Sequence, residues 1–177
     1  MKTLLRTSAL LLALAAALAA CSQAPLTVPL DDFSIQVDAV GNTAGQVVYP
    51  KDAAQFSRPV VNVKTIQLKG QVTASYTAVQ APLTMTFYAR TSDPNNAGCT
   101  DAGLAWICDA SGETAISASY TFADGETQSI TLGDPNPDVL ADGINQGHIW
   151  IGAEVTSGAA TGVTFDFTQM VAQVTVF

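Results

Sequence analysis

The sequence contains a single histidine and few charged residues. Only 12% of its 177 residues are Asp, Glu, Lys or Arg, and fifteen acidic side chains outnumber seven Lys and Arg. This acidic balance argues against nucleic acid as a partner, because phosphate binding needs a basic surface that releases counterions. With His148 as its one imidazole and no Gly-x-Ser-x-Gly turn, the chain lacks the residue sets of most metal centres and of serine hydrolases. We therefore expect a non-enzymatic protein with no cofactor and no catalytic residues.

The first twenty residues have the pattern of a removable signal peptide. Lys2 and Arg6 precede an apolar stretch from Ala9 to Ala20, and no acidic residue is present. This stretch is shorter than the roughly 18–20 residues needed to cross the hydrocarbon core of a bilayer. A short basic segment followed by an apolar segment and small residues is typical of a secretory signal. Cleavage of residues 1–20 would leave five basic and fifteen acidic side chains.

The segment Leu18-Ala19-Ala20-Cys21 resembles the lipobox of bacterial lipoproteins. The resemblance implies that a diacylglyceryl group is transferred to the Cys21 thiol and that the chain is cut before this residue. Two or more acyl chains anchor a protein stably in a membrane. By the same resemblance, Ser22 in place of an Asp favours the outer membrane. The alternative is an ordinary signal cut followed by a buried or disulfide-bonded Cys21.

The composition after the leader favours strands over helices. Residues 21–177 contain 42 Val, Ile and Thr but only 13 Leu, Glu and Lys. β-branched side chains fit a pleated sheet and lose rotamer freedom in a helix. Residues 21–32, which hold two prolines and show no clear period, are predicted to form a lipidated tether. Residues 33–177 are predicted to form the folded domain.

Apolar residues alternate with polar ones in a series of short runs separated by turn residues. The runs are 33–39, 61–68, 72–78, 83–90, 116–122, 128–132, 148–155 and 163–177. Such a pattern predicts an all-β fold, a single antiparallel β-sandwich of about eight or nine strands. The spacing resembles immunoglobulin-like and fibronectin-like sandwiches in general. The alternation slips by one residue near Lys64-Thr65, which indicates a β-bulge.

Cys99 and Cys108 are separated by eight residues and are predicted to form a disulfide. The cell envelope is oxidising, so two thiols close in sequence tend to pair there. A disulfide that closes a loop of this length stabilises the fold by roughly 2.5–3 kcal/mol in the chain-entropy model. A redox or metal pair is the alternative, but redox motifs use Cys-x-x-Cys spacing and a cationic setting.

Four aromatic residues are candidates for a sugar-stacking platform: Trp106, Trp150, Tyr88 and Tyr120. Flat aromatic faces pack well against the apolar faces of sugar rings. The other interpretation places these side chains in the core, because sandwich cores often hold a tryptophan beside a disulfide. His148 lies on the opposite phase to Ile149 and is expected to face solvent at a strand start.

The segment 134–145 offers oxygen ligands that partly match a Ca²⁺ loop. Its candidates are Asp134, Asn136, Asp138 and Asp142. The match to the pattern D-x-[DN]-x-[DN]-G is incomplete, because Val139 stands where the loop needs Gly. The other interpretation is a long solvated loop without metal.

These patterns lead to two hypotheses about function. The first is a non-enzymatic, lipid-anchored protein of the cell envelope that serves as a structural or accessory subunit, with an envelope or surface-layer protein as its partner. The low charge of the chain suits packing against another protein. The second hypothesis is a carbohydrate- or small-ligand-binding module at the cell surface.

Overall fold

The computed structural model describes residues 25–176, so the predicted signal peptide and Cys21 lie outside the described residues. Within residues 25–176, no helix is long and apolar enough to cross a membrane. The elements in chain order are β1 (Leu26–Pro29), β2 (Phe33–Val40), β3 (Gln46–Pro50), β4 (Ala54–Gln55), β5 (Val63–Arg90), the 3-10 helix η1 (Pro94–Ala97), β6 (Thr100–Asp101), β7 (Ala105–Asp109), the 3-10 helix η2 (Ala110–Gly112), β8 (Thr114–Ala115), β9 (Tyr120–Phe122), β10 (Thr127–Leu132), α2 (Pro137–Gln146) and β11 (His148–Val176).

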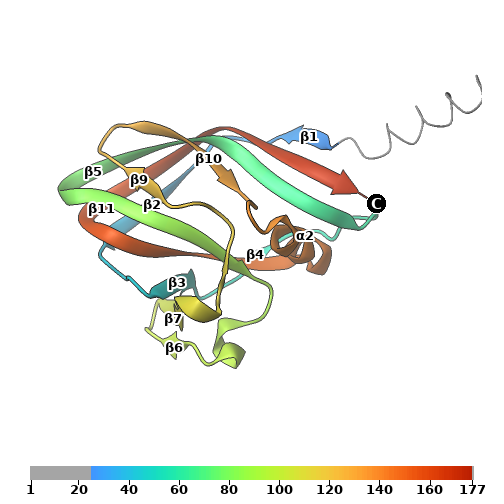
Figure 1. Cartoon of the computed structure of the whole chain (residues 1–177), viewed down its shortest axis with the longest axis horizontal. Helices are drawn as coiled ribbons and strands as arrows, with labels where there is room; N and C mark the ends of the chain where they lie inside the picture. Colours follow the sequence, from blue (N-terminus) through green and yellow to red (C-terminus); the bar gives the residue numbers. More distant parts are fainter. Residues whose placement is uncertain (1–24, 177) are drawn as a thin grey trace, which may run out of the picture.

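Two long strands, β5 and β11, pair antiparallel along their length and organise the rest of the fold. Their register begins with Val63 opposite Val176 and ends with Arg90 opposite Trp150. Both strands turn back at a shared corner, at the left end of the molecule in Figure 1. Three register shifts fall at this corner, over residues 155–160 of β11. β-bulges of this kind bend a strand and increase its twist, so one continuous ladder can supply both layers.

The two layers are the two halves of this folded ladder. The first layer contains residues 63–79 of β5 and 160–176 of β11, with β10 beside β5 and with β1 and β2 beside β11. The second contains residues 83–90 and 148–155, with β8 and β9 beside β5 and with β3 and β4 beside β11. Strand β7 pairs with β3, and β6 pairs with β7. The prediction of an all-β antiparallel sandwich is therefore confirmed, and its layers belong to one eleven-stranded sheet.

The hydrophobic core lies between the layers and takes side chains from both. Phe165 and Phe167 come from the first layer, Leu83 and Ile149 come from the second, and all four are buried. The Phe122 ring of β9 meets the Phe165 ring edge to face, with 5.7 Å between the ring centroids. Each large apolar side chain that is fully buried contributes about 1.5–3 kcal/mol. Contacts between the layers therefore stabilise the folded ladder.

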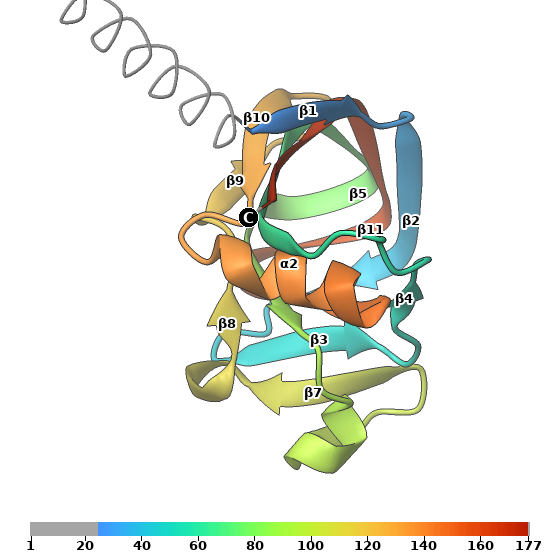
Figure 2. The same ribbon diagram turned by 90° about the vertical axis from the view of Figure 1, so that its right-hand side faces the viewer.

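The helix α2 covers one end of the sandwich, as Figure 2 shows. The prediction of a loop over residues 134–145 was wrong for most of this segment. Pro137 stands in the first helical turn, where its missing N–H costs no hydrogen bond. Leu140 is buried, and a Cβ added to Gly143 would lie 2.7 Å from the side chain of Ile149. The apolar face of the helix packs against the sheet, whereas the Asp, Asn and Pro content of the segment resembles that of a loop.

Strand boundaries differ from the predicted ones in two places. Leu26–Pro29 falls in the predicted tether 21–32, yet it forms β1 and pairs with residues 171–174 of β11. Residues 25–176 contain eleven strands rather than eight or nine. Strand β5 runs through three of the predicted runs without a break, while β4, β6 and β8 span two residues each and are too short to show alternation. The bulge near Lys64 is confirmed, because Thr65 lies opposite Thr175 and the next pair outward is Val63 with Val176.

Gly158 should be essential to the corner. Its φ is +90°, and an added Cβ would lie 2.2 Å from the carbonyl oxygen of Pro82. We expect Gly158→Ala to lower the free energy of unfolding by about 2 kcal/mol or more, because both backbone strain and a clash oppose the side chain. Urea unfolding followed by circular dichroism measures this change. Gly41→Ala is the control, since nothing lies within 4 Å of its added Cβ, and equal losses for the two variants would contradict the prediction.

Candidate functional site

Both tryptophans of the chain line one open cleft on the side of the molecule that carries β3, β4 and β7. We call it the tryptophan cleft. Its volume is ≈ 560 Å³. Small-ligand sites usually have volumes of about 300–1,000 Å³, so the cleft lies within that range. Trp106 and Trp150 are both half-buried there. The remaining lining residues are Lys51, Asp52, Ala53, Gln55, Asp93 and Asn95. The cleft thus combines aromatic surface with carboxylate, amide and ammonium groups.

Strand pairing explains why residues distant in sequence meet in this cleft. Trp106 lies on β7 opposite Tyr49 of β3, and Lys51 follows directly after that strand. Gln55 of β4 pairs with His148 at the start of β11, two residues before Trp150. The β3–β7 pair and the β4–β11 pair therefore bring the two tryptophans to the same place. The 3-10 helix η1 adds Asn95, while Asp93 caps that helix by accepting a hydrogen bond from the Asn95 backbone N–H at 2.9 Å.

Contacts within the cleft orient both indole rings. The Lys51 ammonium lies 3.5 Å from the centroid of the Trp106 ring and also pairs with the carboxylate of Asp101. The hydrogen bond from Lys51 lowers the pKa of Asp101. The Trp150 indole N–H donates to the carbonyl oxygen of Lys51 at 3.5 Å. The ring of His148 meets the Trp150 ring edge to face, with 5.6 Å between centroids.

A small second core beside the cleft contains the disulfide. Cys99 and Cys108 are bonded, with 2.01 Å between the sulfur atoms, so the disulfide prediction is confirmed. Because Trp106 lies between these two cysteines, the disulfide closes the loop that carries it. Val47 and Tyr49 are completely buried in this second core, and both tryptophans pack against it. The indole rings therefore stand on a cross-linked base.

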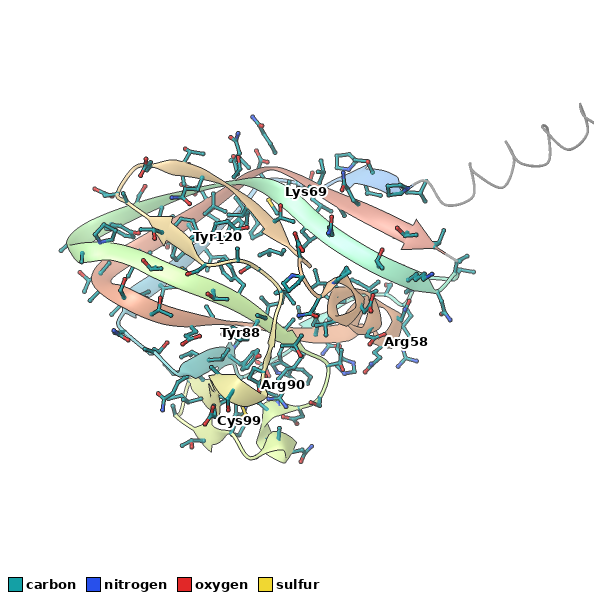
Figure 3. The ribbon with its side chains drawn as sticks, viewed as in Figure 1. Arg58, Lys69, Tyr88, Arg90, Cys99 and Tyr120 are labelled. Atoms are coloured by element: carbon teal, nitrogen blue, oxygen red, sulfur yellow. A yellow bond between two sulfur atoms is a disulfide. The ribbon has the colours of Figure 1, made fainter. Side chains whose placement is uncertain are left out.

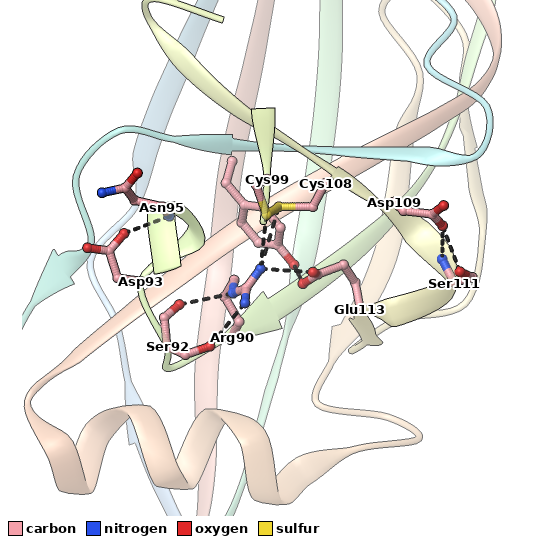
Figure 4. A network of polar contacts seen from close by, with 10 residues as sticks. Arg90, Ser92, Asp93, Asn95, Cys99, Cys108, Asp109, Ser111 and Glu113 are labelled. Atoms are coloured by element: carbon pink, nitrogen blue, oxygen red, sulfur yellow. Dashed lines mark hydrogen bonds and ion pairs between the residues drawn. A yellow bond between two sulfur atoms is a disulfide. The ribbon is translucent and has the colours of Figure 1, made fainter. Parts of the chain in front are cut away.

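A buried ion pair completes this base, as Figure 4 shows. The Arg90 guanidinium donates to Glu113 Oε1 at 2.8 Å, and the two side chains are 12% and 8% exposed. The same Arg90 nitrogen lies 3.4 Å from Cys99 Sγ and 3.5 Å from Cys108 Sγ. The Tyr49 hydroxyl donates to the other oxygen of Glu113 at 2.7 Å. Burial and this hydrogen bond raise the pKa of Tyr49 well above its ordinary value.

Two of the four predicted platform residues lie outside the cleft. The Tyr88 hydroxyl donates to Glu154 Oε2 at 2.7 Å, while the Tyr88 ring packs against the second core. Tyr120 packs against the main core, and its hydroxyl accepts a hydrogen bond from the Thr131 N–H at 2.8 Å. Figure 3 shows Tyr88 and Tyr120 on different parts of the ribbon. For these two tyrosines the core interpretation holds.

The structure does not bring the Ca²⁺ candidates together as a ligand set. Asp138 and Asp142 lie on α2, and Asn136 precedes that helix and donates to the carbonyl oxygen of Ala115 at 2.8 Å. Asp134 comes before Pro135, outside the helix. Among residues 25–176, the one group of three potential ligand atoms lying within 4.8 Å of one another belongs to Cys99, Cys108 and Glu113. Both sulfur atoms of that group are used in the disulfide.

His148 is half-buried rather than facing solvent as the alternation predicted. Its Nε2 lies 3.1 Å from the carbonyl oxygen of Thr91, and its ring supports Trp150. The five polar lining residues of the cleft were missed by sequence reasoning, because they stand in loops, in the two-residue strand β4 and in the 3-10 helix η1. The sequence Asp93-Pro94-Asn95 is typical of a turn, but it does not indicate what the turn borders.

Comparisons with known proteins give only distant likenesses. No family model matches the chain, and no curated protein matches it. A subunit of the disulfide-linked pili of Bacillus endospore appendages is 14% identical, with 86% of this chain and 91% of that chain covered and a TM-score of 0.32. A family 30 carbohydrate-binding module is 12% identical, with 79% and 75% covered and a TM-score of 0.34. A xylan-binding module is 8% identical, with 85% and 97% covered and a TM-score of 0.37. At these values the likenesses carry no argument about function.

The stability of the region around the cleft should fall in alkaline solution. Burial, and then the hydrogen bond to Glu154, raise the pKa of Tyr88 from 10.0 to about 12. A tyrosine whose pKa is higher in the folded than in the unfolded state stabilises the fold fully at pH values below its unfolded-state pKa. This contribution is lost as the pH rises through the folded-state pKa. We therefore expect the free energy of unfolding to decline between pH 10 and about 12, and less steeply in Tyr88→Phe. Urea unfolding at several pH values measures the slopes, and identical slopes for both proteins would refute the assignment.

Proposed function

We propose that this chain is a lipid-anchored protein of the cell envelope that binds a neutral carbohydrate in the tryptophan cleft. One observation carries the proposal: Trp106 and Trp150, 44 residues apart in sequence, both line a single open cleft with polar neighbours. Binding sites for small molecules combine apolar surface with a few polar groups that set orientation. The cleft has this composition.

The chemistry of the lining suits sugar rings. A pyranose has an apolar face of C–H groups and an edge of hydroxyls, so it needs aromatic surface together with hydrogen-bond donors and acceptors. The indole rings supply the surface. Gln55 and Asn95 each offer an amide donor and acceptor, while Asp52 and Asp93 offer acceptors. Hydroxyl groups can use all of these partners.

Charge around the cleft disfavours acidic sugars. The one cationic lining residue, Lys51, is paired with Asp101, which leaves the carboxylates of Asp52 and Asp93 without that compensation. A carboxylate or sulfate on the ligand would be repelled by this rim and by the acidic chain as a whole. Lys51 covers part of the Trp106 ring, but its exposed ion pair contributes only about 0–1 kcal/mol, so displacing it costs little.

The membrane anchor is part of the same proposal and rests on the lipobox resemblance at Cys21. Strand β1 begins at Leu26, five residues after this cysteine. A fully extended chain spans at most about 3.6 Å per residue, so β1 would begin within about 18 Å of the acylated thiol. The domain would stand close to the membrane. The role of accessory subunit in an envelope complex remains compatible with this placement.

The cleft can be tested with substitutions at its tryptophans. We expect the intact protein to bind at least one neutral soluble oligomer of glucose, xylose or N-acetylglucosamine in isothermal titration calorimetry. Trp150→Ala and Trp106→Ala should each weaken this binding about tenfold, which corresponds to the loss of about 1.4 kcal/mol of stacking.

Leu104→Ala is the matched control. Leu104 directly precedes β7, the strand that carries Trp106, and its side chain is 93% exposed. It should bind like the wild type. The proposal fails if no neutral oligomer binds, or if the two tryptophan variants bind as tightly as the control while retaining the circular dichroism spectrum of the folded protein.

The anchor makes a separate prediction for the chain produced in bacteria. Wild-type protein should stay with the membrane fraction after a high-salt wash, and its N-terminal peptide should carry the mass of a diacylglyceryl group on Cys21. Cys21→Ser should abolish that mass. The double variant Cys99→Ser, Cys108→Ser is the control, since it removes the disulfide and leaves the predicted anchor in place. An unmodified wild-type N-terminus would disprove the lipid anchor and would leave the proposal of carbohydrate binding in the cleft unaffected.

A further inference from the structure

The edge strand β2 combines an open backbone edge with an uncovered row of apolar side chains. Strand β2 pairs with β11 on one side, and among residues 25–176 no strand pairs with its other side. Figure 2 shows β2 along one side of the molecule. The exposed fractions of Phe33, Ile35 and Val37 are 45%, 46% and 36%. Such an edge presents unpaired N–H and C=O groups to any further strand.

The apolar row lies on the core side of the sheet. Phe33, Ile35 and Val37 stand opposite Phe167, Phe165 and Val163 of β11, which are buried. Residues opposite each other in an antiparallel pair point to the same face. The row therefore continues the buried face of β11 outward, beyond the point where the second layer covers it. A further strand in this sheet would extend the same apolar face.

We propose that β2 pairs antiparallel with β2 of a second copy of this chain, about a two-fold axis at Gln36. This inference goes beyond the proposed carbohydrate binding. The two-fold axis makes the contact self-complementary and closed, as in most soluble homodimers. Placing Gln36 opposite Gln36 aligns Ile35 with Val37 and Phe33 with Ala39, so the apolar rows of both copies share one face.

The low charge of β2 allows a second copy to approach here, and its one charge selects the register. The chain is acidic overall, with a net charge of −8, so two copies repel each other over most of their surfaces. Strand β2 itself carries a single charge, that of Asp38. In the register centred on Gln36, Asp38 lies opposite the neutral Ser34. A register centred on Ile35 would place Asp38 opposite Asp32, and like charges directly opposite each other destabilise a sheet.

The lipid bilayer is a less suitable occupant of this surface. Hydrocarbon would leave the open backbone groups of β2 without hydrogen bonds, at a cost of several kcal/mol each. A second strand satisfies these groups and covers the apolar row at the same time. Because one added strand forms an interface smaller than about 1,000 Å², the dimer is weak in dilute solution. Confinement of both copies to one membrane raises their effective concentration.

Cysteine crosslinking in membranes of cells that produce the full chain tests the register. In Gln36→Cys, the two introduced thiols lie opposite each other, within the distance that a disulfide bridges. In the matched control Asp38→Cys, the two thiols are separated by about 13 Å along the paired strands. After mild oxidation, we expect about fivefold more disulfide-linked dimer on a non-reducing gel for Gln36→Cys than for Asp38→Cys.

A second substitution separates specific pairing from random collision. Ile35→Lys in the Gln36→Cys chain puts a charge into the apolar row of each copy and should reduce the dimer to the level of Asp38→Cys. Equal yields of dimer for Gln36→Cys and Asp38→Cys, or a yield unchanged by Ile35→Lys, would overturn the proposal.

Wild-type chain crosslinked through a free Cys21 would instead show that the lipid anchor is wrong. The comparison of positions 36 and 38 is then repeated in Cys21→Ser.

Discussion

The folding of one antiparallel ladder back on itself is the constraint on which the rest of this structure depends. Strands β5 and β11 stay paired through the corner, so each supplies one strand to both layers. Bulges bend the ladder at this corner, and Gly158 adopts a φ there that other residues adopt only with strain. Once the ladder is folded, seven of the shorter strands pair with its two edges, and β7 and β6 follow on β3. The tryptophan cleft and the β2 edge both lie along the β11 side of the ladder.

The cleft has a rigid base, whereas its rim is built from loops. The disulfide, the Arg90–Glu113 pair and the buried Tyr49 lie together in the second core, and Trp106 is carried on the loop that the disulfide closes. A buried ion pair contributes little by itself, but removal of one partner leaves an uncompensated charge and costs about 3–5 kcal/mol. This base therefore holds the position of the indole rings. The polar rim stands on turns that can adjust to a ligand.

Sequence reasoning succeeded for features that depend on residues close together in the chain. The disulfide between Cys99 and Cys108 and the bulge near Lys64 were predicted correctly, because both depend on residues close in sequence. The aromatic candidates were half right: Trp106 and Trp150 line the cleft, while Tyr88 and Tyr120 find hydroxyl partners and pack against the cores. Nothing in the local pattern distinguishes these cases. The helix α2 was missed because its one apolar face is short and its flanks resemble a loop.

The sequence by itself determined the strand-rich character, the acidic charge and the cysteine pair, since composition, alternation and short loops act locally. Only the tertiary structure decided that Leu26–Pro29 joins the sheet and that β5 passes through three predicted runs as one strand. It also decided that Trp106 and Trp150 meet at Lys51 and that Phe33 to Val37 remain uncovered at an edge. These features depend on which strands become neighbours. Pairing between residues far apart in the chain is set by the packing of the whole sheet, and no single stretch of sequence encodes it.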